Sequence, residues 1–391
     1  MLVPLVAALA RTGNVVRARV ARQRAVDLAR RLRDGRRLLA ALTSWDAPVI
    51  WTLRVEARID YAIVMPLRDA LANDGNDRET RARLLTALVY ELEGLDCEAA
   101  SVAALQARTL ARAAGDPRAL CGALGAVGYI AYGPDLSAQR LSNAEELLRT
   151  ATAHRFDDYR ALAHFQLFLA HNAELDLAGA ARHLGESLTL ASGGQVGQLI
   201  LVGMAYDALC NVLTGRLDAA QSAYERVTER MIREGTASAA AFGLVGAMSC
   251  AAARGNFGEL VGPLSAVVPH WPVAIRIPLS LALFDAGDHE AARATWTKSA
   301  PYPRDYYWLP MTTLRAHVAA RLRDSEACAT IRRELEPFSG MIAGLESGSM
   351  YAGPVDSALA AMADVVGDRH VATRYRAAAD DLTKRIVAQL R

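Results

Sequence analysis

Residues 276–300 read RIPLSLALFDAGDHEAARATWTKSA, and this segment is the clearest indication of the fold class. Its apolar first half ends at Gly287, and Asp288 follows directly. In the second half, Ala292 and Trp296 are four residues apart. Glycine takes the left-handed conformation that closes a helix, and Asp caps the exposed N–H groups of the next helix. The stretch therefore predicts two helices joined by a short turn, with Ala292 where they approach most closely.

The same turn recurs along the chain. Copies that carry Gly with Asp or Asn lie at 13–14, 215–218, 255–256 and 367–368, and weaker copies lie at 95–96, 175–176 and 323–324. With a further weak copy before Ser137, the residues after the turns from 95 onward lie at 97, 137, 177, 217, 257, 289, 325 and 369. They are 40, 40, 40, 40, 32, 36 and 44 positions apart. A period of this length is typical of helix-pair solenoids, and the 287 copy carries the tetratricopeptide (TPR) pattern.

These repeats predict an all-α fold, a right-handed superhelical solenoid of about nine to ten TPR-like helix pairs. We expect one domain over residues 1–391, with an Arg-rich first pair at 1–40 and a capping repeat at 337–391. Irregular segments are expected at 129–137, where Gly133-Pro134 breaks a helix, and at 263–272 and 337–354.

Composition agrees with a helical protein. Of the 391 residues 52% are hydrophobic but only 6% aromatic, so the apolar content is mainly Ala, Leu and Val. The five cysteines are odd in number and form no CxxC, which favours core thiols in a reducing cytoplasm over disulfides or a zinc site. No apolar run reaches the roughly 18 residues of a membrane span, so we expect a cytoplasmic protein without membrane contact.

Charge is uneven although the net charge is only +2. Residues 1–40 contain ten Arg against Asp27 and Asp34. Arg17, Arg24 and Arg31 recur every seven residues, as one face of a helix would. This face first suggests the solvated outer side of an end-capping repeat, which needs a polar exterior. The alternative is a docking face for an acidic partner, and Arg17, Arg24 and Arg31 are the candidate docking residues. Few aromatics interleave with these Arg, which disfavours direct nucleic-acid binding.

A ligand groove is expected along the first helices of the repeats. The predicted positions are mostly apolar, whereas a carboxylate clamp would place Lys, Arg and Asn there. We expect an amphipathic helix or a hydrophobic small molecule as ligand. The alternative is an error of one or two residues in register, or a superhelix that fills its own groove. The residues expected at the groove are Leu162, Phe165, Leu169, Val202, Leu209, Phe242, Ile277, Leu281, Phe284 and Trp308.

No motif predicts catalysis. The sequence has no GxxxxGK[ST] phosphate loop and no GxSxG, so no catalytic residue, metal or cofactor is expected. His164 and His171 are seven residues apart, but no partner His-x-x-Glu is evident, and we interpret them as structural. If the chain were an enzyme, Asp285, Glu174 and His317 would be the first residues to inspect.

Four stretches carry a resemblance to a known family. They are WTLR at 51–54, AYGPDLSAQRL at 131–141, GNFGELVGPL at 255–264, and EPFSGMIAGLESGSMYAGPVDSALAAMADVVGD at 336–368. In these the chain resembles the TPR-like C-terminal region of large bacterial STAND ATPases, namely LuxR-type and SARP-type transcriptional regulators and their adenylate-cyclase-linked relatives. The ATPase and DNA-binding motifs of that family have no counterpart here.

The resemblance implies a non-enzymatic, protein- or effector-binding module in bacterial transcriptional or signalling regulation. Its expected partner is a regulator or ATPase, or a hydrophobic effector. The alternative is an enzyme of specialised metabolism that uses the groove as a hydrophobic active site.

Overall fold

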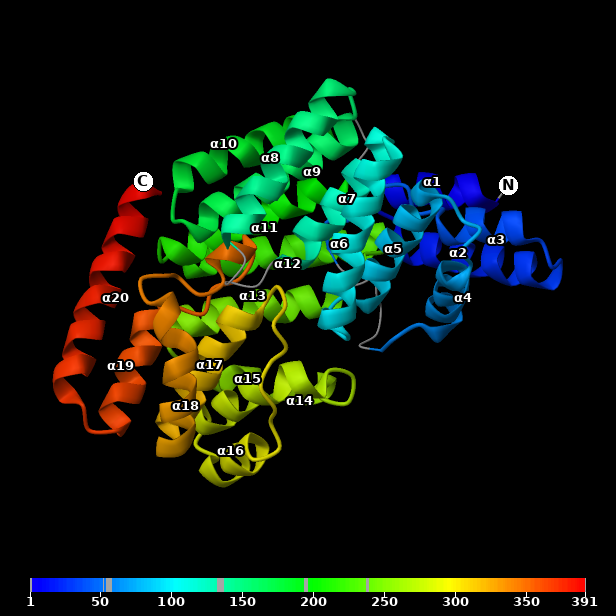
Figure 1. Cartoon of the computed structure of the whole chain (residues 1–391). Coiled ribbons are helices and arrows are strands. Elements are labelled where there is room, and N and C mark those ends of the chain that lie inside the picture. Colours follow the sequence, from blue (N-terminus) through cyan, green and yellow to red (C-terminus); the bar gives the residue numbers. More distant parts are fainter. Residues whose placement is uncertain are drawn as a thin grey trace. The chain divides into compact units, whose positions relative to one another are not determined.

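The computed structural model describes residues 2–51, 53, 58–131, 137–192, 196–236 and 239–390. Within these ranges the chain forms twenty α-helices and no strand, which confirms the all-α prediction (Figure 1). None of the described helices combines the length and apolar character needed to cross a membrane. The expected helix break at Gly133-Pro134, and Thr52 and Arg54 of the family resemblance, lie outside the described residues.

The helices have the following bounds. They are α1 Leu2–Arg11, α2 Val15–Arg31, α3 Gly35–Leu42, α4 Tyr61–Ala72, α5 Arg78–Leu92, α6 Cys97–Ala114, α7 Pro117–Ile130, α8 Ser137–Ala153, α9 Asp157–Ala173, α10 Leu177–Ala191, α11 Gln198–Leu213, α12 Leu217–Glu234, α13 Ala239–Arg254, α14 Val261–Val267, α15 Pro272–Asp285, α16 His289–Trp296, α17 Trp308–Arg321, α18 Ser325–Leu335, α19 Val355–Val365 and α20 Arg369–Gln389.

The turn chemistry is as predicted. Gly287 has φ +89°, and the Asp288 side chain accepts a hydrogen bond from the backbone N–H of Ala291 at 3.0 Å. Two of the weaker copies use the same conformation without glycine: Leu175 and Arg323 have φ values of 61° and 54°. The copy at 95–96 follows Gly94, which has φ +68°. Arg33 (φ 50°) and Arg155 (φ 57°) close two further helices in this way, and neither turn was recognised from the sequence.

The chain divides into two compact units with interleaved segments. Unit 1 comprises residues 1–170, 179–203 and 229–239, and unit 2 comprises 171–178, 204–228 and 240–391. The boundary passes within α9 to α13, so no linker separates two independent domains. The single uninterrupted array stays a prediction.

Each unit is built from neighbours in sequence. In unit 1, α5 packs on α6, α6 on α7 and α7 on α8, and α5 also contacts α7. In unit 2, the pairs α15–α16, α17–α18 and α19–α20 pack internally, while α17 contacts both α15 and α19. This pattern, in which a helix contacts its pair mate and the first helix of the next pair, is that of helical repeats.

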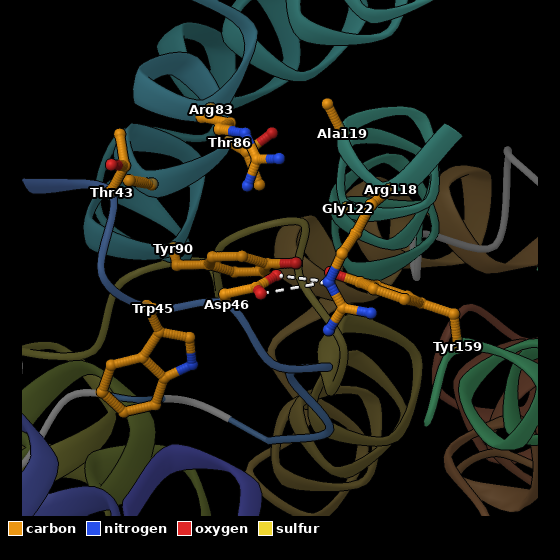
Figure 2. Close-up of a pocket in the computed structure, with 11 residues that line it drawn as sticks. Thr43, Trp45, Asp46, Arg83, Thr86, Tyr90, Arg118, Ala119, Gly122 and Tyr159 are labelled. Atoms are coloured by element: carbon orange, nitrogen blue, oxygen red, sulfur yellow. Dashed lines mark hydrogen bonds and ion pairs between the residues drawn. The ribbon is translucent and has the colours of Figure 1, made fainter. Parts of the chain in front are cut away.

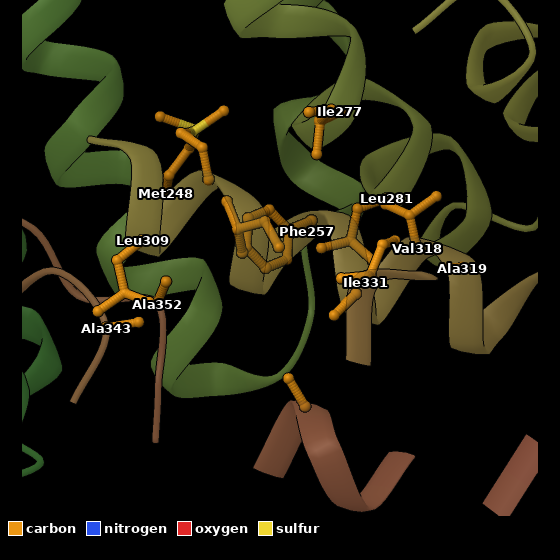
Figure 3. Packing of buried hydrophobic residues seen from close by; sticks show 14 of the residues in the cluster. Met248, Phe257, Ile277, Leu281, Leu309, Val318, Ala319, Ile331, Ala343 and Ala352 are labelled. Carbon is orange, nitrogen blue, oxygen red and sulfur yellow. The ribbon is translucent and has the colours of Figure 1, made fainter. Parts of the chain in front are cut away.

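The core of unit 2 is a continuous apolar cluster between its helix pairs (Figure 3). Phe257, Ile277 and Leu281 lie in it together with residues of the irregular segment that follows α18. Residues 342–350 of that segment are buried, and a side chain holds the backbone there: the Tyr224 hydroxyl donates to the Ser349 carbonyl at 2.9 Å. Gly344 has φ +96°, and a Cβ there would lie 2.4 Å from the carbonyl oxygen of Met350. The loop between α18 and α19 is therefore part of the core.

Candidate functional site

A small polar hollow in unit 1 brings together charged and aromatic side chains (Figure 2). It has room for about 30 Å³, the size of one water molecule or a small polar group. Its walls come from the loop after α3, from α5, from the start of α7, and from α9. The lining residues are Thr43, Trp45, Asp46, Arg83, Thr86, Ala87, Tyr90, Arg118, Ala119, Gly122 and Tyr159.

Arg118 organises the hollow. Its Nε lies 3.0 Å from both carboxylate oxygens of Asp46, and its Nη2 lies 2.8 Å from Oδ2 of the buried Asp158. The guanidinium carbon also lies 5.4 Å and 5.2 Å from the ring centroids of Phe156 and Tyr159. Paired carboxylates and aromatic contacts fix this side chain in one position.

Arg83 approaches from the opposite helix. Its Nε donates to Glu79 at 3.0 Å, and its Nη2 lies 3.7 Å from Asp116, which caps the first turn of α7. Arg11 lies 3.3 Å from Asp46, so the carboxylate there has two guanidinium partners. With three Arg facing four carboxylates, the site does not select for a free anion by charge alone.

The aromatic walls can offer hydrogen-bond donors. Burial raises the pKa of Tyr90 and of Tyr159, and the Asp46 charge adds to the effect at Tyr159. Both phenols therefore stay protonated at neutral pH. The indole Nε1 of Trp45 is shielded from solvent and has no hydrogen-bond partner among the described residues. The protonated phenols of Tyr90 and Tyr159 border the hollow and are therefore the donors available to an incoming acceptor.

The hollow reflects the repeat, although the sequence analysis did not single it out. Arg118 and Asp158 are 40 residues apart, the spacing of the turns, and Asp46 is 72 residues from Arg118. Equivalent positions of successive repeats thus meet across the helices. The 40-residue period could have predicted the contact between Arg118 and Asp158. No local sequence pattern indicated that Trp45 or Tyr90 would line the hollow.

The ten residues expected at an apolar groove serve as core residues in this conformation. Nine are buried with at most 5% of their surface exposed, and Phe284 is half-buried, with its ring 4.5 Å from that of His289. Ile277, Leu281 and Trp308 share the core cluster of unit 2. Leu162, Phe165, Leu169 and Val202 belong to unit 1, and the others to unit 2. Ligand binding by these side chains stays a prediction.

The residues considered for catalysis have structural contacts. Asp285 pairs with Arg321 and accepts the backbone N–H of Phe257 at 2.8 Å. His317 is half-buried, and desolvation with the nearby Arg321 charge lowers its pKa to about 4. Glu174 is exposed.

The histidines are arranged differently from the spacing considered in the sequence. His164 lies against His183, with their Nδ1 atoms 3.0 Å apart, while His171 lies 2.8 Å from Asp176. Among the described residues, no group of three or more His, Cys, Asp or Glu is placed to hold a metal ion.

The predicted docking arginines, Arg17, Arg24 and Arg31, are all exposed on α2. The cysteines form no disulfide, and burial raises the pKa of Cys121 to about 12.

No known protein-family model matches the chain, and the search of curated proteins found no match.

Proposed function

We propose that this chain is a binding module built from TPR-like helix pairs, nine to ten in one right-handed array, that acts in bacterial transcriptional or signalling regulation. Its partner would be a regulator or an ATPase, in keeping with the family resemblance, and its setting the cytoplasm. The observation that carries the proposal is the hollow around Arg118, described above.

Residue types support a recognition role for the hollow. Trp, Tyr and Arg are the side chains that most often dominate binding energy at protein interfaces. Here Trp45, Tyr90, Arg83 and Arg118 border one partly open space of about 30 Å³. The space is too small for a whole hydrophobic effector but fits one polar side chain of a partner. We therefore assign it the role of receiving an anchoring hydroxyl, carboxamide or carboxyl group.

Affinity capture with a matched pair of variants tests this function. Arg83→Gln alters the hollow, while Arg112→Gln removes an exposed ion pair with Glu146 on another surface. We expect the wild type and Arg112→Gln to retain one protein in near-stoichiometric amount from a bacterial lysate, and Arg83→Gln to lose it. Circular dichroism checks that both variants fold. Equal retention by all three, or turnover of a co-purified small molecule, would contradict the proposal.

A further inference from the structure

The structure separates the arginines of residues 1–40 into two groups. Arg22 is buried, donating to Glu91 at 2.7 Å and to the carbonyl of Leu42 at 2.8 Å. Arg19 contacts the same Glu91 and Asp60. These inward arginines hold α2 against α5 and the segment before α4. Arg17, Arg24 and Arg31 point away and have no ion pair within the described part of the chain.

Exposed apolar side chains interleave with the outward arginines. Val16 is 38% exposed, Val20 48% and Leu28 46%. At 100° per residue these three and the outward arginines occupy one face of α2, roughly 120° wide. The opposite face, with Ala18, Ala25 and Ala29, packs into unit 1. The outer face is thus both basic and apolar over a helix of 17 residues, about 25 Å long.

We propose that this face of α2, defined by Val16, Arg17, Val20, Arg24, Leu28 and Arg31, docks an acidic amphipathic helix of a protein partner. The inference rests on the proposed binding function and names a second contact surface for it. An α-helix with an apolar stripe would cover Val16, Val20 and Leu28, and its flanking Asp or Glu would pair with the three arginines.

Charge and apolar exposure together select this occupant. A nucleic-acid backbone would pair with the arginines but would leave three aliphatic side chains against phosphates. A bilayer surface favours Trp, Phe and several Leu on the buried side of a helix, and this face carries two valines, one leucine and no aromatic residue. An acidic amphipathic helix pairs its carboxylates with the arginines and covers the aliphatic side chains with its apolar stripe.

The test uses the full chain and a designed 18-residue helical peptide with a Leu stripe flanked by Glu, labelled for fluorescence anisotropy. A second peptide has every Glu replaced by Lys. We expect the Glu peptide to bind at least tenfold more tightly than the Lys peptide, with affinity falling as NaCl rises from 50 to 300 mM.

Variants locate the binding. R17E/R24E reverses two outward charges seven residues apart, and R226E/R233E does the same on exposed positions of α12. We expect the first pair to weaken peptide binding at least tenfold and the second less than twofold. V20S/L28S should also weaken peptide binding. A peptide affinity that does not change in R17E/R24E overturns the proposal, as does tighter binding to a DNA duplex or to phosphatidylserine vesicles than to the peptide.

The two proposals fail separately. If the partner captured by the wild type is lost with Arg83→Gln but retained by R17E/R24E, the α2 inference is wrong and the binding function stands. If the peptide binds at α2 while no partner depends on Arg83, the hollow is not the recognition site.

Discussion

At the residue scale, identical side chains have different roles because they face different directions on one helix. Arg19 and Arg22 point into unit 1 and neutralise Glu91, which has no exposed surface. Arg17 and Arg24 point to solvent. A buried carboxylate needs its partners, because desolvation of an unpaired charge costs several kcal/mol.

Glu91→Gln should destabilise unit 1 by about 3–5 kcal/mol, because it leaves the Arg22 guanidinium buried without a counter-charge. Urea unfolding followed by circular dichroism measures the change. Glu146→Gln, which removes a partly exposed partner of Arg112, should cost less than about 1 kcal/mol. Equal losses in the two variants would contradict the assignment of Arg22–Glu91 as a buried pair.

His317 should make stability depend on pH. Its pKa is about 4 in the folded chain and about 6.5 when unfolded, so between these values the unfolded state binds more protons. The free energy of unfolding should therefore fall as pH drops from 6.5 to 4, by about 1–3 kcal/mol from this group. Above pH 6.5 the effect is absent. His317→Gln should flatten that part of the pH–stability curve, and a curve of unchanged slope would exclude this role.

At the element scale, the turn between helices is a unit of local chemistry. Gly287 and Asp288 show its full form, while Arg155 holds the same left-handed conformation with φ 57° at a cost of roughly 1–2 kcal/mol. Tight turns thus persist where the sequence lacks the favoured residue, because the packed helices on both sides fix the backbone.

Arg155→Gly should stabilise the chain by about 0.5–1 kcal/mol by relieving the left-handed strain, since glycine adopts this conformation freely. Arg149→Gly, the same replacement in the middle of α8, should destabilise by about 1 kcal/mol. Differential scanning calorimetry on both variants gives the sign of each change. Destabilisation by both would contradict the strain at Arg155.

Ala292→Leu should cost roughly 1–3 kcal/mol, because Ala292 has no exposed surface where α15 and α16 meet, and its carbonyl accepts the Ser280 hydroxyl at 2.8 Å. Ala294→Leu on the exposed side of the same helix is the control, and we expect less than about 0.5 kcal/mol. Thermal melts compare the two. A neutral Ala292→Leu would mean that the helix pair is less closely packed than described.

At the scale of the whole molecule, each compact unit has its own apolar core and its own polar features. Unit 1 carries the hollow around Arg118 and the outer face of α2. Unit 2 carries the buried loop after α18, with Gly344 and Ser349. If the helix pairs form the proposed repeat array, stability is a sum of local and nearest-neighbour contributions.

A destabilising substitution in one unit should therefore lower the hydrogen-exchange protection of backbone amides in that unit first. Glu91→Gln is expected to raise exchange in α2, α5 and α7 well before α17 and α19, because a local destabilisation opens its own cooperative unit first. Mass spectrometry of peptide fragments after timed exchange measures this. Equal loss of protection in both units would show that the chain opens as one cooperative structure.

The helical class, most of the turns and the small residues between paired helices could be predicted from the sequence. Caps such as Asp288 and close contacts such as Ala292 depend on neighbours within a few residues, so their pattern is visible in one dimension. The TPR-like repeat and the family it resembles stay proposals that rest on this pattern. Four turns place Arg or Leu in the left-handed conformation: those at Leu175 and Arg323 were recognised from the sequence, and those at Arg33 and Arg155 were not.

Which side chains face each other was not predicted from the sequence and is known from the fold. The structure showed that Arg118 meets Asp46 and Asp158, that Trp45 and Tyr90 border the same hollow, and that the arginines of α2 divide between Glu91 and solvent. It also placed the expected groove side chains in the core. These outcomes depend on how each helix is rotated against its neighbours, and contacts between residues 40 to 72 positions apart set that rotation.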